Sequence, residues 1–286
     1  MQITRPLLSA ALNGTSRISA RSAGRAAFAL FCYTGPRIPV RPAEQPVMDA
    51  AWPGALTVNG KHVATYCWGD GENPVLLVHG WQFRAARWAP VITALRDAGY
   101  TPVAFDAPGP GASAGRETNI LEYREVMRQL GEEYGRFDAV IGHSFGALAA
   151  VFALRGAIRA DAVVSISGVA DFGFLAKGFT YGLGLNARVG AELRRRLGEF
   201  LAARDTGSPD RYSATHRPEE IDTPLLLVHD EQDAVVGRDQ ADAMLAAYGD
   251  RARLLLTRGL GHRRILADPD VVAATLGFVS AAELRR

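Results

Sequence analysis

From about residue 55 onwards, short apolar runs alternate with longer segments in which apolar residues recur every three or four positions. The short runs predict buried strands, and the recurrence predicts helices that are apolar on one side. Because the two alternate, we expect an α/β fold with a mostly parallel, doubly wound sheet that helices cover on both faces. The predicted parallel strands are 75–78, 103–105, 139–141, 162–166, 225–228 and 252–256.

Turn residues support these boundaries. Asn59-Gly60 lies between the apolar segments 56–58 and 62–68. This dipeptide supplies the positive φ angles of a two-residue turn, so the segments predict a β-hairpin. Glycines also follow three of the periodic segments and predict helix C-termini. These glycines are Gly99, Gly135 and Gly249.

One interval breaks the alternation. More than fifty residues separate Ser167 from Pro224, which is too long for a single crossover between strands. Within a domain over residues 51–286, we expect residues 171–217 to form an inserted helical lid over the carboxyl ends of the strands. A longer helical connection without that role is the alternative. The aromatic residues that we expect to bind substrate are Phe172, Phe174, Phe179 and Tyr181.

About the first forty residues differ from the rest in composition, being rich in Ser, Ala and Arg. Arg17, Arg21 and Arg25 recur every four positions and would share one face of a helix. We expect residues 1–50 to be a basic arm and linker, with a surface helix packed on the body. Weak contact with a membrane surface through residues 1–35, or a targeting segment, are the alternatives.

Composition limits the classes of function. The 286 residues are 48% hydrophobic and 22% charged, which is typical of a globular domain and excludes disordered, collagen-like and coiled-coil proteins. The net charge is only +2 and its excess lies in residues 1–50, so a nucleic-acid partner is not expected. Cys32 and Cys67 are too few and too far apart for a disulfide framework, and predict a reducing, cytoplasmic location, with membrane association through the arm as the alternative.

One motif carries chemistry. Gly142-His143-Ser144-Phe145-Gly146 directly follows the predicted strand 139–141 and begins an Ala-rich helical run over residues 147–154. A G-x-S-x-G sequence between strand and helix forms a cramped turn in which only small neighbours fit, and it exposes the serine hydroxyl. Ser144 is therefore the expected nucleophile. The alternative is a tight glycine turn with an inactive serine.

With this motif in place, residues 55–283 resemble the α/β-hydrolase family. The resemblance implies that His79-Gly80-Trp81, at the end of a predicted strand, is the loop that binds the oxyanion. The backbone NH groups of Trp81 and Phe145 are then the expected oxyanion hole, because such donors are positioned before charge develops. His79 itself is expected to be structural.

The same resemblance implies the order nucleophile, acid, base along the chain. His262, in Gly-Leu-Gly-His after the last predicted strand, is the expected base, and Asp233 is the expected acid. Asp106 begins a Gly- and Pro-rich turn that matches the family and is expected to shape that turn. The alternatives for the acid are, in decreasing order, Asp230, Asp171 and Glu231.

These residues imply a serine hydrolase that cleaves carboxylic esters, thioesters or small amides through an acyl-enzyme, with neither cofactor nor metal. A serine at position 144 disfavours dehalogenase and epoxide hydrolase chemistry, which needs a carboxylate nucleophile. The expected partner is a small-molecule acyl substrate with an uncharged or apolar acyl group. An acyltransferase, a cofactor-free oxygenase or peroxidase, and a non-catalytic binding protein are the alternatives on the same scaffold.

Overall fold

The computed structural model describes residues 5–206 and 208–283, and the chain divides into two compact units. The sheet unit comprises Thr34–Ala170 and Ala214–Arg286, and the helical unit comprises Met1–Tyr33 and Asp171–Ser213. Each unit therefore contains two separate segments of the chain.

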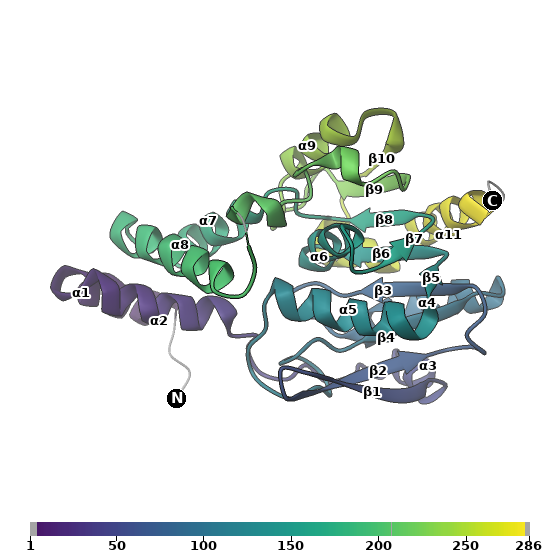
Figure 1. Cartoon of the computed structure of the whole chain (residues 1–286), viewed down its shortest axis with the longest axis horizontal. Helices are drawn as coiled ribbons and strands as arrows, with labels where there is room; N and C mark the ends of the chain where they lie inside the picture. The colour runs from purple at the N-terminus through teal and green to yellow at the C-terminus, as the bar shows by residue number, and fades with distance from the viewer. Residues whose placement is uncertain (1–4, 207, 284–286) are drawn as a thin grey trace. The chain divides into compact units, whose positions relative to one another are not determined.

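The sheet unit is built on an eight-stranded sheet in the order β1-β2-β4-β3-β6-β8-β9-β10 (Figure 1). β2 is antiparallel to both β1 and β4, and all other neighbouring pairs are parallel. The expected α/β fold with a mostly parallel sheet is confirmed. The strands are β1 (Trp52–Val58), β2 (Lys61–Cys67), β3 (Pro74–Val78), β4 (Thr101–Phe105), β6 (Ala139–His143), β8 (Val163–Ile166), β9 (Leu225–Asp230) and β10 (Ala252–Thr257). A separate pair contains β5 (Arg136–Phe137) and β7 (Arg159–Ala160).

Helices cover the sheet, which explains the continuous apolar runs. Every residue of β3, β4 and β6 is buried, as is typical of parallel strands that are packed on both sides. Two of the covering helices, α4 and α11, contribute to one apolar cluster with these strands. The helices of the sheet unit are α3 (Gln45–Asp49), α4 (Ala89–Asp97), α5 (Ile120–Tyr134), α6 (Phe145–Leu154), α9 (Arg238–Tyr248), α10 (Gly261–Arg264) and α11 (Pro269–Glu283) (Figure 1).

The turns have the conformations that their residues predict. Asn59 and Gly60 join β1 to β2 with φ angles of 49° and 73°. Gly135 and Gly249 end α5 and α9 with φ angles of 72° and 55°, where a residue with a Cβ would be strained.

The helical unit contains α1 (Arg5–Ile18), α2 (Ala20–Cys32), α7 (Phe172–Gly182) and α8 (Ala187–Ala202). Its buried apolar cluster is small and draws on both segments of the chain. Gly24 of α2 lies so close to Glu192 of α8 that a Cβ would overlap the glutamate side chain. The amide of Asn186 donates to Asn13 Oδ1 at 2.8 Å, and the Asn186 side chain donates to Ser16 at 2.9 Å. The buried residues of the cluster are Leu12, Ala23, Ala27, Leu185 and Val189.

This division differs from the expected arm over residues 1–50 and lid over residues 171–217. The first 33 residues belong to the same unit as the insertion, whereas residues 34–50 belong to the sheet unit. There, Arg84 donates to the carbonyl of Ile38 at 2.9 Å, and Trp68 donates to that of Val47 at 2.7 Å. The predicted linker is thus tied to the sheet unit by buried side chains.

The helix that was expected to carry three arginines on one face is also interrupted. Ser19 adopts an extended conformation and caps α2, with its hydroxyl accepting from the amide of Ser22. Arg17 therefore lies on α1, and Arg21 and Arg25 lie on α2. A serine is a good helix cap, which explains the break.

Within residues 5–206 and 208–283, no single helix is both long and apolar enough to cross a membrane. Of the helices that the structure describes, the bent pair Gly261–Ala267 and Pro269–Ala282 alone reaches that length and composition. Its Val271, Phe278 and Val279 are buried in the core of the sheet unit.

Candidate active site

Ser144 lies in a strained turn between β6 and α6. Its φ and ψ angles are 53° and −121°, a combination that costs a non-glycine residue on the order of 1–3 kcal/mol. A Cβ on Gly142 would lie 2.5 Å from Ala147 Cα, and one on Gly146 would overlap the carbonyl oxygen of Val78. The amide of Ser144 donates to the carbonyl of Ile166 in β8 at 2.9 Å and ties the turn to the sheet. Both glycines of the motif are thus required by close backbone contacts.

Three loops bring the predicted nucleophile, base and acid together. Ser144 follows β6, Asp233 follows β9 and His262 follows β10, so all three lie at the carboxyl ends of parallel strands. His262 Nε2 lies 3.1 Å from Ser144 Oγ, and His262 Nδ1 lies 2.7 Å from Asp233 Oδ2. When Nδ1–H donates to the carboxylate, the lone pair of Nε2 faces the serine hydroxyl and accepts its hydrogen bond. This is the arrangement that general-base activation of a serine requires.

The Asp233 carboxylate is held in its ionised form. Its other oxygen accepts from the amides of Val235 at 2.8 Å and Val236 at 3.0 Å. Burial alone would raise the pKa of Asp233, but the hydrogen bonds from His262 and these amides outweigh it and lower the pKa to about 2. The carboxylate is therefore charged at neutral pH and stabilises an imidazolium beside it.

Asp230, the nearest alternative for the acid, is engaged elsewhere. One carboxylate oxygen accepts from the amide of Gln232 at 3.0 Å, and the other from Thr257 Oγ1 at 2.9 Å and the amide of Leu260 at 3.0 Å. These bonds join the loop that carries Asp233 to the loop that carries His262. Asp230 thus connects the two loops and is not aimed at the imidazole.

The other carboxylates also have structural partners. Asp171 caps α7 in the helical unit by accepting from the amide of Gly173 at 2.7 Å, and Glu231 lies 3.4 Å from Arg238 on the surface. Asp106 is fully buried. The oxygens of Asp106 accept from Ala85 N at 2.8 Å, Ala112 N at 2.8 Å, Arg84 Nη2 at 3.0 Å and Tyr66 Oη at 3.1 Å.

The loop and the turn that carry the two expected oxyanion donors are in contact. A Cβ on Gly80 would lie 3.1 Å from Ser144 Cβ, so the loop after β3 passes directly against the nucleophile turn. The rings of Trp81 and Phe145 meet edge to face with centroids 5.4 Å apart. Among the described residues, no hydrogen bond uses the amide of either residue. Phe145 is the first residue of α6, where amides lack an intrahelical acceptor and the helix dipole favours negative charge.

His79 has the geometry of a structural residue. Its Nε2 accepts from the amide of Ala107 at 2.9 Å, and its Nδ1 lies 2.8 Å from the carbonyl of Gly80, to which Nδ1–H donates. Burial lowers the pKa of His79, so the ring is neutral and both nitrogens are engaged.

His143 is a residue of the site that sequence reasoning missed. Its Nε2 lies 2.9 Å from the backbone oxygen of His262, to which Nε2–H donates, and the two ring centroids are 4.7 Å apart. Burial, together with the nearby charge of His262, lowers the pKa of His143 to about 3, so this ring is neutral. The only signal in the sequence was its place beside Ser144 in the motif.

The aromatic residues expected to bind substrate all belong to the helical unit. Phe172 is buried and packs on Tyr212 with centroids 5.3 Å apart, and Phe179 meets Phe31 edge to face at 5.5 Å. Phe174 is half-buried, and Tyr181 is 90% exposed. Phe172 and Phe179 thus have packing roles within their own unit, and contact of all four with substrate stays a prediction.

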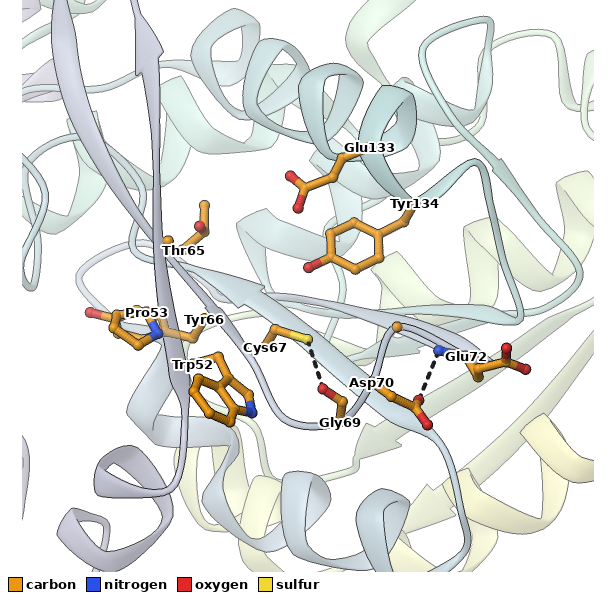
Figure 2. A pocket seen from close by; sticks show the side chains of 12 residues that line it. Trp52, Pro53, Thr65, Tyr66, Cys67, Gly69, Asp70, Glu72, Glu133 and Tyr134 are labelled. Atoms are coloured by element: carbon orange, nitrogen blue, oxygen red, sulfur yellow. Dashed lines mark hydrogen bonds between the residues drawn. The ribbon is translucent and has the colours of Figure 1, made fainter.

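A cavity of about 670 Å³ lies elsewhere on the sheet unit, between β1, β2, the loop after β2 and the end of α5 (Figure 2). The loop leads into β3 at Pro74, so the cavity lies at the amino ends of the parallel strands, opposite the edge that carries Ser144. Its lining includes Trp52, Tyr66, Cys67, Glu133 and Tyr134. Among the described residues, no group of three or more His, Cys, Asp or Glu side chains is placed to hold a metal ion.

Comparison with known proteins agrees with this geometry. Residues 75–275 match a family described as the alpha/beta hydrolase family. An esterase of Pyrococcus furiosus is 19% identical with a TM-score of 0.64, over 87% of this chain and 98% of that one. An esterase of a Rhodococcus species is 17% identical with a TM-score of 0.59, over 82% and 99%. A thioesterase domain from the curacin biosynthetic pathway is 17% identical with a TM-score of 0.59, over 81% and 99%.

Such low identities establish the fold alone, and no curated protein sequence matches the chain. The family match spans the nucleophile turn, the acid loop and the base loop. This chain belongs to the alpha/beta hydrolase family.

Proposed function

We propose that this protein is a serine hydrolase that cleaves carboxylic esters through an acyl-enzyme on Ser144. One observation carries the proposal: the hydrogen-bonded series Ser144 Oγ, His262 Nε2, His262 Nδ1, Asp233 Oδ2, with separations of 3.1 and 2.7 Å across the imidazole. Structural neighbours that are described as esterases and a thioesterase domain support acyl chemistry.

Acylation begins when His262 Nε2 accepts the hydroxyl proton of Ser144 while Oγ bonds to the carbonyl carbon of the ester. The π electrons of the carbonyl move onto its oxygen. The amides of Trp81 and Phe145 donate to that oxyanion, and because they are fixed by the backbone they need no rearrangement as its charge develops. Asp233 keeps the imidazole in the required tautomer and stabilises its positive charge.

The tetrahedral intermediate collapses when the carbonyl reforms and the alkoxide leaves, taking the proton from His262. Water then occupies the place of the alcohol. His262 accepts one proton of the water as its oxygen attacks the acyl carbon, and Ser144 Oγ leaves and recovers that proton. The products are the carboxylic acid and the free enzyme, so all atoms and charges balance without a cofactor.

The helical unit is proposed to act as the lid. Two of the three chain connections to it lie in or beside loops that follow the carboxyl ends of strands. The first passes Thr34, whose amide donates to the carbonyl of Arg116 in the loop after β4 at 3.0 Å. The second follows Ala170, four residues beyond the end of β8. The aromatic side chains of this unit favour an uncharged or apolar acyl group.

Hydrolysis of p-nitrophenyl esters tests the reaction. If an acyl-enzyme forms, p-nitrophenol should be released in a rapid first turnover and then at a slower steady rate. The His262→Ala variant should lose both the rapid release and the steady rate. Hydrolysis that persists in that variant would contradict the proposal. If p-nitrophenol release stops after the first turnover and continues only when an alcohol acceptor is added, the protein is an acyltransferase instead.

A series of acyl chains tests the lid. Esters of increasing acyl length should be hydrolysed with decreasing KM until the binding site is filled. Replacing Phe174 by Ala should raise KM for long chains and leave KM for the acetate ester unchanged. A preference for charged acyl groups would refute the apolar site.

A further inference from the structure

The two units carry opposite net charge. The helical unit has 11 Lys and Arg against five Asp and Glu, a net charge of +6. The sheet unit has 21 against 25, a net charge of −4. The small net charge of the whole chain therefore conceals a strongly basic unit, which attracts anionic surfaces.

The acids of the helical unit lie on its second segment, not on its N-terminal helices. Asp171, Glu192 and Asp205 each pair with a basic residue of the same segment, at 3.8, 2.6 and 3.0 Å respectively. No Asp or Glu occurs between residues 5 and 33. The arginines of the first two helices are thus free of acidic neighbours on their own helices.

Three of these arginines face solvent. Arg17, Arg21 and Arg25 are exposed, and among the described residues none of them forms an ion pair. The hydrogen bond from Arg195 is the main cause that lowers the pKa of Glu192, and the charge of Arg21 contributes less. Their positive charge is therefore available to an external partner.

The exposed side of α1 is apolar. Leu7, Ala11, Gly14 and Ile18 follow each other at intervals of four, three and four residues, which places them on one face of the helix, and all four are exposed. Leu7 is 63% and Ile18 is 93% exposed, although the opposite face of α1 buries Leu12. Large apolar side chains left in water on a basic helix are typical of helices that lie in a membrane interface.

An exposed aromatic side chain, that of Tyr181, lies close to the start of α1. The side chain of Arg5 donates to the carbonyl of Gly182 at the end of α7, and the neighbouring Tyr181 is 90% exposed. Lys177, one turn earlier on α7, is also exposed. Tyrosine combines an apolar ring with a polar hydroxyl and is enriched at the level of lipid headgroups.

We propose that the exposed faces of α1 and α2, together with Tyr181, form a docking surface that binds the protein to an anionic phospholipid membrane. Leu7 and Ile18 insert among the upper acyl chains, and the arginines bind lipid phosphates. A nucleic acid would also attract the arginines, but it offers no apolar phase for Leu7 and Ile18. The prediction for residues 1–35 included residues 1–4, which lie outside the described residues.

Sedimentation with lipid vesicles tests the proposal. The full-length Ser144→Ala variant is mixed with vesicles of phosphatidylcholine alone, or with vesicles in which about a third of this lipid is replaced by phosphatidylglycerol. The protein should sediment with the anionic vesicles only, and less of it as salt increases. Because no turnover is measured, failure of vesicle binding leaves the proposed hydrolase function unaffected.

Two sets of substitutions locate the binding surface. Leu7→Glu with Ile18→Glu should weaken binding at least about tenfold, because apolar side chains are replaced by charges that the anionic surface repels. Replacing Arg17, Arg21 and Arg25 by Glu should weaken it at least as much. All these side chains are exposed, so the thermal unfolding midpoint should not change.

Matched substitutions on the sheet unit provide the controls. Trp52 is 73% exposed, so Trp52→Glu removes an exposed apolar side chain outside the docking surface. Replacing exposed Arg96, Arg159 and Arg253 by Glu changes the net charge by the same amount as the helical-unit triple. Both controls should retain most of the binding. Absence of binding to anionic vesicles, equal binding to neutral ones, or an equal loss in the controls would overturn the proposal.

Discussion

The sheet unit is distinguished by its buried polar groups, and the helical unit by the apolar side chains on the exposed face of α1. In the sheet unit, polar groups at the carboxyl edge are buried and hydrogen-bonded, so that Ser144 and His262 are each only 9% exposed. In the helical unit the buried cluster is small, and large apolar side chains such as Ile18 remain exposed. The buried polar groups of the sheet unit hold the candidate catalytic side chains in place. The exposed apolar side chains of the helical unit leave a surface for the proposed membrane binding.

Removing the nucleophile or the base should have the largest effect on turnover. It should not change vesicle binding, which is proposed for the helical unit. Ser144→Ala and His262→Ala should each lower kcat/KM by roughly 10⁴-fold or more, because each removes a group that bonds to or moves a proton in the transition state. Steady-state kinetics measures this loss. Vesicle binding by the same variants should not change, and a loss of both properties would show that the two units do not act separately.

Substitutions of Asp230, the last residue of β9, and of Asp233, in the loop after it, should have different effects. Asp233→Asn should lower kcat/KM by roughly 10²- to 10⁴-fold, because an amide neither fixes the tautomer nor stabilises the imidazolium. Asp230→Asn should mainly lower the thermal unfolding midpoint, because the bonds between the two loops weaken. If Asp230→Asn abolishes turnover and Asp233→Asn does not, the acid has been assigned wrongly.

Substitution of His143 should have a smaller effect on turnover, because His143 acts only by positioning His262. His143→Phe keeps a ring of similar size but loses the donor to the backbone oxygen of His262. We expect kcat to fall about tenfold with KM little changed, since the substrate is not contacted. The thermal unfolding midpoint serves as the control for folding. An unchanged kcat would mean that this hydrogen bond does not position the base.

The close contact between α2 and α8 should matter for the helical unit alone. Gly24→Val forces a side chain against Glu192 and should destabilise that packing by about 1–3 kcal/mol. Gly14→Val is the matched control, because no atom other than those of its chain neighbours and of the backbone of its own helix lies within 4 Å of the position that its Cβ would occupy. Hydrogen exchange should accelerate in α2 and α8 in the first variant only, and equal rates in both would contradict the packing account.

Much of the sheet unit was predictable because its signals are local. Buried parallel strands are continuous apolar runs, Asn59-Gly60 dictates its own turn, and the glycines around Ser144 mark the nucleophile turn. The candidate base was predictable for a similar reason, since His262 follows the last strand at the family's position.

Other features depend on contacts that leave no local trace. The sequence at the end of β9 favoured Asp233 but left Asp230 open as an alternative, because the choice depends on which carboxylate faces the imidazole of His262, 29 residues beyond Asp233. The union of the N-terminal helices with the insertion depends on pairs such as Asn13 and Asn186, which are 173 positions apart. The bond from His143 to the backbone of His262 is equally non-local.

Covalent labelling tests the central claim most directly. The native protein is treated with a fluorophosphonate, which reacts with activated serine hydroxyls, and the modified peptide is identified by mass spectrometry. We expect one adduct, on Ser144, that is lost in the His262→Ala variant although the serine is still present. Labelling at another serine, or undiminished labelling of Ser144 without His262, would contradict it.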